Sequence, residues 1–82
     1  MFYVYILRSL VYLDKTYVGY TKDLKKRLEI HNSGRSFHTS KYKPWKIELY
    51  IAFSSQDKAI AFEKWLKTGN GVVFRNKYLI QV

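Results

Sequence analysis

Apolar residues recur at two different spacings along this chain, and the order of these spacings restricts the folds that it can adopt. Two short runs, Phe2 to Arg8 and Thr16 to Tyr20, are rich in β-branched and aromatic residues. Large apolar residues then occupy every second position from Trp45 to Phe53. These patterns predict three β-strands, of which the first two form a hairpin. In the third strand, all of the large apolar side chains from Trp45 to Phe53 should point to one face of the sheet.

Helical spacing appears in the segments that follow the second and third strands. Thr21 is a candidate N-cap for a helix that ends near Asn32, where a Ser-Gly pair follows. Ser54 or Ser55 should cap a second helix that reaches Thr68. The sequence therefore predicts that strands and helices alternate after the initial hairpin.

The end of the chain supplies a third, shorter element. Gly69 is in the position of a glycine that ends the second helix. Residues 72–81 should form a short closing helix, although their Val-Val-Phe start is also typical of a strand. The element order ββαβαα predicts an α+β fold, a small three-stranded antiparallel sheet flanked by two to three helices. The 82 residues are expected to form a single domain, residues 1–82, with a thin core, because a chain of this size buries roughly 60% of its unfolded surface.

The composition excludes several classes of protein. There is no cysteine, so disulfides and thiolate zinc sites are absent. The apolar N-terminus carries Arg8 and has neither a basic start nor a small-residue cleavage site, and no run approaches the ~20 apolar residues of a membrane span. We therefore expect a soluble, cytoplasmic protein without a membrane partner.

The charge of the chain is strongly unbalanced. Fifteen Lys and Arg residues oppose six Asp and Glu residues, which gives a net charge of +9. Such a surplus on a small body attracts polyanions. Nucleic acid is the first candidate, and an anionic ribosome or membrane surface is the second.

Two polar residues border the apolar stripe of the first predicted helix. Leu24 and Leu28 define that stripe, and at ~100° per residue Arg27 falls beside it and His31 almost above Leu24. Structural explanations are an inward arginine paired with an acid and a histidine satisfied within the core. The functional explanation is that both side chains face a site.

The second predicted helix carries a carboxylate on its apolar face. Glu63 lies among Ala59, Phe62 and Leu66 at helical spacing. A buried, unpaired carboxylate costs several kcal/mol, so Glu63 needs a cation, a metal ion or a raised pKa. An ion pair with Lys67, four residues later, is the structural alternative.

The hairpin places two tyrosines on one face of the sheet. A register that brings Tyr5 across from Tyr17 leaves Gly19 beside them without a side chain to crowd the phenols. Aromatic pairs also stabilise sheets, so this feature alone has little functional meaning.

These residues together resemble the GIY-YIG endonuclease superfamily. Tyr3-Val4-Tyr5, followed after eleven residues by Tyr17-Val18-Gly19, is similar to the paired GIY and YIG tripeptides. Residues 21–28 together with His31 resemble the helix of that family that carries its arginine. Residues 44–49 and 61–67 are similar to the small stand-alone, single-domain (YhbQ-like) members. The resemblance extends from Phe2 to about Leu79 and implies hydrolysis of phosphodiester bonds in nucleic acid, with DNA favoured over RNA.

The resemblance also implies a role for each matched residue. Tyr5 and Tyr17 take the positions of the motif tyrosines, one of which deprotonates or orients the attacking water. Arg27 would stabilise charge on the phosphate, and His31 would assist proton transfer. Glu63 would hold one divalent metal ion, Mg²⁺ or Mn²⁺.

Several positions depart from the family pattern. Tyr3 replaces the glycine of the first motif, and Tyr20 follows Gly19 where some members carry a basic residue. Lys22 or Lys15 would have to supply that charge. Asn76 lies about where some members have a late asparagine.

The segment between residues 33 and 44 is polar and basic, and it also contains Phe37 and Tyr42. Basic side chains neutralise phosphates, and aromatic side chains stack on unpaired bases. A solvated loop is the structural alternative. The residues that we expect to contact nucleic acid are Lys22, Arg35, His38, Lys41 and Lys43.

Two alternatives to a nuclease remain at the level of sequence. One is a nucleic-acid-binding module of the same fold with weak or no activity, or with activity that depends on a partner protein. The other is a basic protein that interacts with the ribosome or with nucleic acid. The sequence permits a monomer or a weak homodimer.

Overall fold

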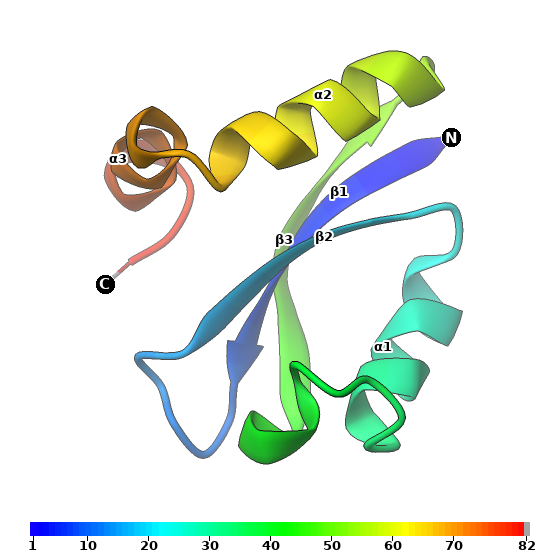
Figure 1. Ribbon diagram of the computed structural model, residues 1–82, viewed down its shortest axis with the longest axis vertical. Helices are drawn as coiled ribbons and strands as arrows, with labels where there is room; N and C mark the ends of the chain where they lie inside the picture. Colours follow the sequence, from blue (N-terminus) through cyan, green and yellow to red (C-terminus); the bar gives the residue numbers. More distant parts are fainter. Residues whose placement is uncertain (82) are drawn as a thin grey trace.

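A three-stranded antiparallel sheet runs through the middle of the molecule (Figure 1). In the computed structural model, which describes residues 1–81, the strand order is β2-β1-β3. The elements in chain order are β1 (Phe2–Ser9), β2 (Thr16–Thr21), α1 (Leu24–Asn32), the 3₁₀ turn η1 (Ser40–Tyr42), β3 (Trp45–Phe53), α2 (Gln56–Leu66) and α3 (Gly69–Tyr78). This arrangement confirms the α+β fold and the ββαβαα order.

Helices cover both faces of the sheet. Figure 1 shows α2 and α3 on one side of the strands and α1 on the other. Val4 and Ile6 of the central strand pack in one apolar cluster with residues of α2, whereas Tyr5 and Leu7 pack in a second cluster with residues of α1. The central strand is therefore buried on both faces, and it reads as a continuous apolar run rather than an alternating one.

A β-bulge in β3 changes which face its residues occupy. Ile6 of β1 pairs with Leu49, but the next residue, Leu7, pairs with Ile47, so Glu48 is an extra residue without a partner on β1. Ile47 consequently packs in the cluster with α1 and Leu49 in the cluster with α2. The expectation that the large apolar residues of this strand share one face is wrong for this reason.

The ends of α1 and α2 are set by side-chain caps. Asp23 rather than Thr21 is the N-cap of α1, because its carboxylate accepts a hydrogen bond from the backbone N–H of Lys26. Thr21 instead accepts from the N–H of Asp23. Ser55, one of the two expected residues, caps α2.

The junction between α2 and α3 differs from the sequence-based expectation. Gly69 does not end α2; it is the first residue of α3, which Thr68 caps by accepting from the N–H of Gly71. A Cβ at Gly71 would lie 2.0 Å from the carbonyl oxygen of Trp65, so the glycine allows α3 to turn tightly against the end of α2. The closing helix therefore begins three residues earlier than expected. None of the described helices is long and apolar enough to cross a membrane.

Candidate active site

The two motif tyrosines project from the same face of the sheet. Tyr5 lies directly across from Gly19 and Tyr17 across from Leu7, so the register differs by two residues from a direct Tyr5–Tyr17 pair. Their ring centroids are 6.5 Å apart. The diagonal arrangement places the Tyr5 ring over Gly19 and leaves Tyr17 beside it.

His31 joins these tyrosines from the last turn of α1. Its side chain is buried, and its Nε2 lies 2.9 Å from the Tyr5 hydroxyl. The ring centroid of Tyr17 is 5.0 Å from that of His31. Burial, followed by the positive charge of Arg27, lowers the pKa of His31 from its ordinary 6.5 to about 4, so the imidazole is neutral at pH 7.

The other nitrogen of His31 contacts a residue that the sequence analysis missed. His31 Nδ1 lies 2.7 Å from Thr39 Oγ1, and Thr39 is buried. Thr39 belongs to the basic segment after α1. The polar composition of this segment does not indicate that one of its side chains is buried. A buried histidine on an apolar helix face requires two hydrogen-bond partners, but the sequence cannot say which distant residue provides the second one.

Arg27 lies one turn before His31 on α1 and brings a positive charge to the phenol. Within residues 1–81, its buried Nε has no hydrogen-bond partner. Burial raises the pKa of Tyr5, whereas the hydrogen bond and positive charge of Arg27 act in the opposite direction. A buried guanidinium N–H without an acceptor is suited to an anionic ligand, because leaving such a donor unpaired is costly.

Glu63 approaches from the opposite side of the sheet, on α2. Its side chain is only 14% exposed, and its carboxylate lies 2.5 Å from Lys67 Nζ. The ion pair expected as the structural alternative is thus formed. The pair nevertheless lies at the phenols: Lys67 Nζ is 5.8 Å from the Tyr17 ring centroid, and the charge of Glu63 contributes to the raised pKa of Tyr5.

The donors at this site fit a hard divalent cation held by one carboxylate. Among the described residues there is no group of three or more His, Cys, Asp or Glu side chains that could enclose a metal. Mg²⁺ does not need such a cage, since it retains most of its water ligands and is held by one or two carboxylates together with substrate phosphates. Glu63 is the residue that meets this requirement.

Comparison with known proteins agrees with this geometry. The family model of the GIY-YIG catalytic domain matches residues 1–78. The chain belongs to the GIY-YIG family. UPF0213 proteins from Streptococcus pyogenes serotypes M3, M1 and M4 are each 40% identical to it over 67 residues, covering 79% of this chain and 70% of the relative. The fold is accordingly of the nuclease type, and the names of these relatives state no activity.

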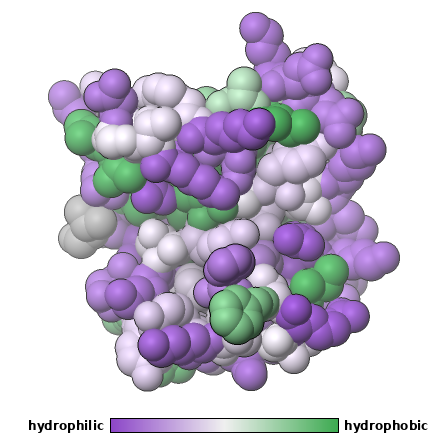
Figure 2. Space-filling model, in the orientation of Figure 1, coloured by the Kyte–Doolittle hydropathy of each residue, from purple (hydrophilic) through white to green (hydrophobic). Residues whose placement is uncertain are grey.

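The basic segment of this GIY-YIG domain is exposed on its outer side. Two hydrogen bonds between the Asn32 side chain and the backbone of Trp45 fix its ends, and Trp45 Nε1 donates to the carbonyl oxygen of Thr39 at 2.8 Å. The face in Figure 2 is mostly hydrophilic, with apolar residues in separate patches. The expected nucleic-acid contacts are all exposed side chains, namely Lys22, Arg35, His38, Lys41 and Lys43.

Asn76 is not brought to the phenols by any hydrogen bond within the part of the chain that the structure describes. It lies exposed on α3, the helix that follows the tight turn at Gly71. Its role in this GIY-YIG domain stays a prediction.

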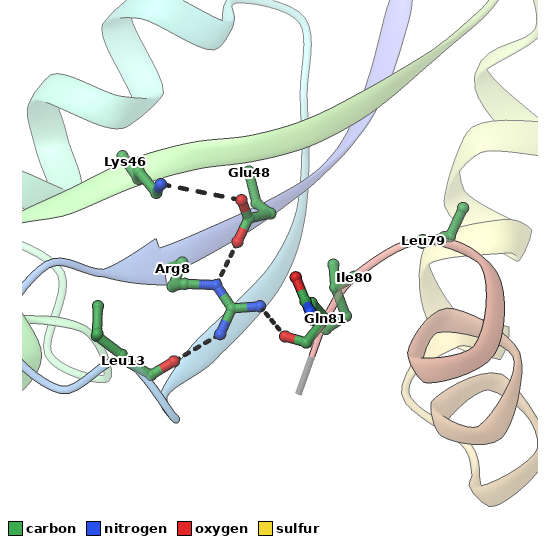
Figure 3. Close-up of a pocket in the computed structure, with 7 residues that line it drawn as sticks. All are labelled: Arg8, Leu13, Lys46, Glu48, Leu79, Ile80 and Gln81. Carbon is green, nitrogen blue, oxygen red and sulfur yellow. Dashed lines mark hydrogen bonds and ion pairs between the residues drawn. The ribbon is translucent and has the colours of Figure 1, made fainter.

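A cavity of about 440 Å³ lies away from the phenols, between the hairpin and the C-terminal segment (Figure 3). The Arg8 guanidinium lines it, and each of its three nitrogens makes one hydrogen bond, to Glu48 and to the carbonyl oxygens of Leu13 and Gln81. Arg8 therefore connects the C-terminal segment to the hairpin of the domain.

Proposed function

We propose that this protein hydrolyses phosphodiester bonds in nucleic acid, with DNA favoured over RNA, and uses one divalent metal ion. The observation that carries the proposal is the buried Nε of Arg27, which has no hydrogen-bond partner among residues 1–81 and belongs to the guanidinium that acts on the pKa of Tyr5. Hydrolysis places additional negative charge on the phosphate, and a guanidinium offers planar donors to its oxygens while keeping its own charge. Arg27 is therefore the residue that binds the reacting phosphate.

Tyr5 is the phenol best placed to exchange a proton with the attacking water. It is buried, it is hydrogen-bonded to His31, and the charge of Arg27 favours its ionised form. Because burial raises the pKa of Tyr5, the oxygen is a phenol in the free protein, and the positive charge of Arg27 and of the basic surface favours its ionisation. Tyr17, which is half-buried beneath Lys67, orients the water and supports the Tyr5 ring.

Glu63 would hold the metal ion, Mg²⁺ or Mn²⁺. When bound, the ion polarises a phosphoryl oxygen and neutralises charge on the leaving oxygen. Lys67 must leave the Glu63 carboxylate for this to happen, and its half-exposed side chain permits that movement. Lys67 thus acts as the counter-ion of Glu63 in the metal-free protein.

The substrate enters beside the basic segment that follows α1. No acidic residue occurs between Glu29 and Glu48, whereas this stretch contains Arg35, Lys41 and Lys43. Such a run attracts phosphates without distinguishing base sequence. Substrate choice should therefore depend on the shape of the nucleic acid.

A cleavage assay tests the proposal. Wild-type protein should cut branched, nicked or single-stranded DNA in the presence of Mg²⁺ or Mn²⁺, and Tyr5→Phe, Arg27→Lys and Glu63→Gln should each lower the rate by roughly a hundredfold or more. Tyr78→Phe, in an exposed tyrosine of α3, is the matched control and should cut normally. If wild type and Glu63→Gln cleave at the same rate with every metal, the result contradicts the proposed metal-dependent hydrolysis.

The ion pair between Lys67 and Glu63 favours a second candidate, a nucleic-acid-binding module that does not cut. In that case the ammonium ion would replace the metal permanently. Such a protein would bind DNA with a steep salt dependence and show no metal-dependent cleavage. A basic interaction protein would instead lose binding when exposed Lys25 and Lys26 are removed and tolerate Glu63→Ala.

A further inference from the structure

Thr39 is held against the candidate active site by hydrogen bonds of both its backbone and its side chain. It is fully buried, its carbonyl oxygen accepts from Trp45 Nε1 at 2.8 Å, and its backbone N–H donates to the carbonyl of Ser36 at 3.2 Å. These contacts place its hydroxyl 2.7 Å from His31 Nδ1. The position of the Thr39 hydroxyl is therefore fixed by the fold.

The direction of this hydrogen bond follows from the available acceptors. Thr39 Oγ1 carries one proton and has two acceptors within reach, His31 Nδ1 at 2.7 Å and the Ser36 carbonyl oxygen at 3.4 Å. The Ser36 carbonyl already accepts the N–H groups of Thr39, at 3.2 Å, and Ser40, at 3.0 Å. Two bonds use both of its lone pairs, so the hydroxyl proton points to Nδ1.

The tautomer of the His31 imidazole then determines whether Nε2 donates a hydrogen bond to the Tyr5 oxygen. His31 is neutral at pH 7, and a neutral imidazole carries one N–H. Because Nδ1 accepts from Thr39, the proton is on Nε2, which lies 2.9 Å from the Tyr5 hydroxyl oxygen.

We propose that Thr39 is a positioning residue that keeps His31 in the tautomer protonated on Nε2, so that His31 donates to the Tyr5 oxygen. The His31 N–H donor and the nearby positive charge of Arg27 both stabilise a phenolate at that oxygen. His31 therefore does not remove the Tyr5 proton; it supports the ionised oxygen. The catalytic consequence rests on the proposed function, whereas the tautomer itself does not.

The tautomer can be measured without substrate or metal. In wild-type protein labelled with ¹⁵N-histidine, NMR at pH 7 should show the proton of His31 on Nε2. In Thr39→Val the Nδ1 resonance should move toward that of an unbonded imidazole nitrogen, and in Thr39→Ser it should stay near the wild-type position. Ser40→Ala is the control. It removes a neighbouring hydroxyl that donates to the Phe37 carbonyl oxygen, and it should shift the resonance of neither His31 ring nitrogen. The proposal is wrong if the proton of wild-type His31 is on Nδ1. It is also wrong if the Nδ1 resonance is the same in Thr39→Val and in wild type.

Kinetics provide the second readout. Thr39→Val should lower kcat by roughly 10- to 100-fold with little change in KM, because the misplaced ring affects the reacting group and not substrate binding. Thr39→Ser should recover most of the rate. A Thr39→Val protein that cuts at the wild-type rate contradicts the positioning role. If the wild-type protein cuts no substrate, the proposed function is wrong. The NMR result still shows which tautomer His31 adopts.

Discussion

Gly19 lies directly beneath the hydroxyl of Tyr5, and this contact depends on the absence of a side chain. A Cβ at Gly19 would be 2.3 Å from the Tyr5 hydroxyl oxygen and 2.4 Å from the ring carbon that bears it. The backbone of Gly19 needs no unusual dihedral angle, so the requirement is space alone. The second motif of this GIY-YIG domain thus provides room for the phenol of the first.

Gly19→Ala should therefore displace Tyr5 and break its hydrogen bond to His31. We expect a loss of about 1–3 kcal/mol in the free energy of unfolding, the usual cost of overpacking a tight site, together with loss of cleavage. Denaturant titration and the cleavage assay measure the two effects. Gly69→Ala is the matched control, because none of the described residues outside the local chain has an atom within 4 Å of a Cβ there, and the stability should stay the same or rise slightly. Equal behaviour of the two variants would show that Tyr5 is not confined by Gly19.

The buried imidazole of His31 predicts a pH dependence of stability. Its pKa in the folded protein is about 4, below its ordinary 6.5, so the unfolded chain binds a proton that the folded protein does not. The stabilisation is complete above about pH 6.5 and declines as the pH falls toward 4, with a loss of ~2 kcal/mol between pH 7 and pH 5. Unfolding free energies measured across this range should show the decline in wild type and in His38→Gln, whose histidine is exposed. In His31→Gln this decline should largely disappear. If the unfolding free energy of His31→Gln still falls with pH as in wild type, another titratable group causes the decline.

The sequence predicted the elements of the fold and the convergence of the chemical groups better than it predicted their connections. Local patterns are sufficient for these elements: β1 and β2 are runs of β-branched and aromatic residues, β3 alternates, and α1 and α2 carry apolar residues at helical spacing. The bulge at Glu48 and the start of α3 at Gly69 were missed, since both depend on how distant segments pair and pack. Thr39 was missed for a similar reason: its partner, His31, is eight residues away across a loop whose path the sequence does not define.

The ion pair between Glu63 and Lys67 predicts that the lysine competes with metal. Lys67→Gln should raise the affinity for Mg²⁺ or Mn²⁺ several-fold, because a cation no longer occupies the carboxylate. In metal-free buffer the variant should unfold at a lower temperature, since a mostly buried carboxylate loses its partner, and added Mg²⁺ should raise its Tm more than that of wild type. Calorimetric titration and thermal scans measure both effects. Lys64→Gln, on the same helix, serves as control, and metal affinities that are identical in Lys67→Gln and wild type would argue against a metal at Glu63.

The basic segment after α1 predicts a characteristic salt dependence of nucleic-acid binding. If Lys41 and Lys43 contact phosphates, Lys41→Gln and Lys43→Gln should each reduce the slope of log K against log salt concentration by about 0.7–0.9 and weaken binding to all sequences alike. Fluorescence anisotropy over a range of salt concentrations measures the slope. Lys77→Gln on α3 removes the same charge elsewhere and should leave the slope nearly unchanged, whereas equal effects of all three would indicate a diffuse field rather than a defined contact.

Phe37 in the same segment predicts a preference for unpaired bases. Its ring is 88% exposed and contacts the edge of the His38 ring, at 5.6 Å between centroids, so one of its faces is open to solvent. Stacking of a base on an aromatic ring contributes about 1–3 kcal/mol and releases no counter-ions. Phe37→Ala should therefore weaken binding to single strands about 5- to 100-fold, leave the salt slope unchanged, and affect binding to a blunt duplex little. Phe37→Trp should bind single strands as well as wild type or better.

Tyr50→Ala, at an exposed tyrosine of β3 that is 54% accessible, controls for the loss of an aromatic surface. If Phe37→Ala weakens single-strand and duplex binding equally, the ring does not stack on a base, because stacking requires a base that is free of its partner.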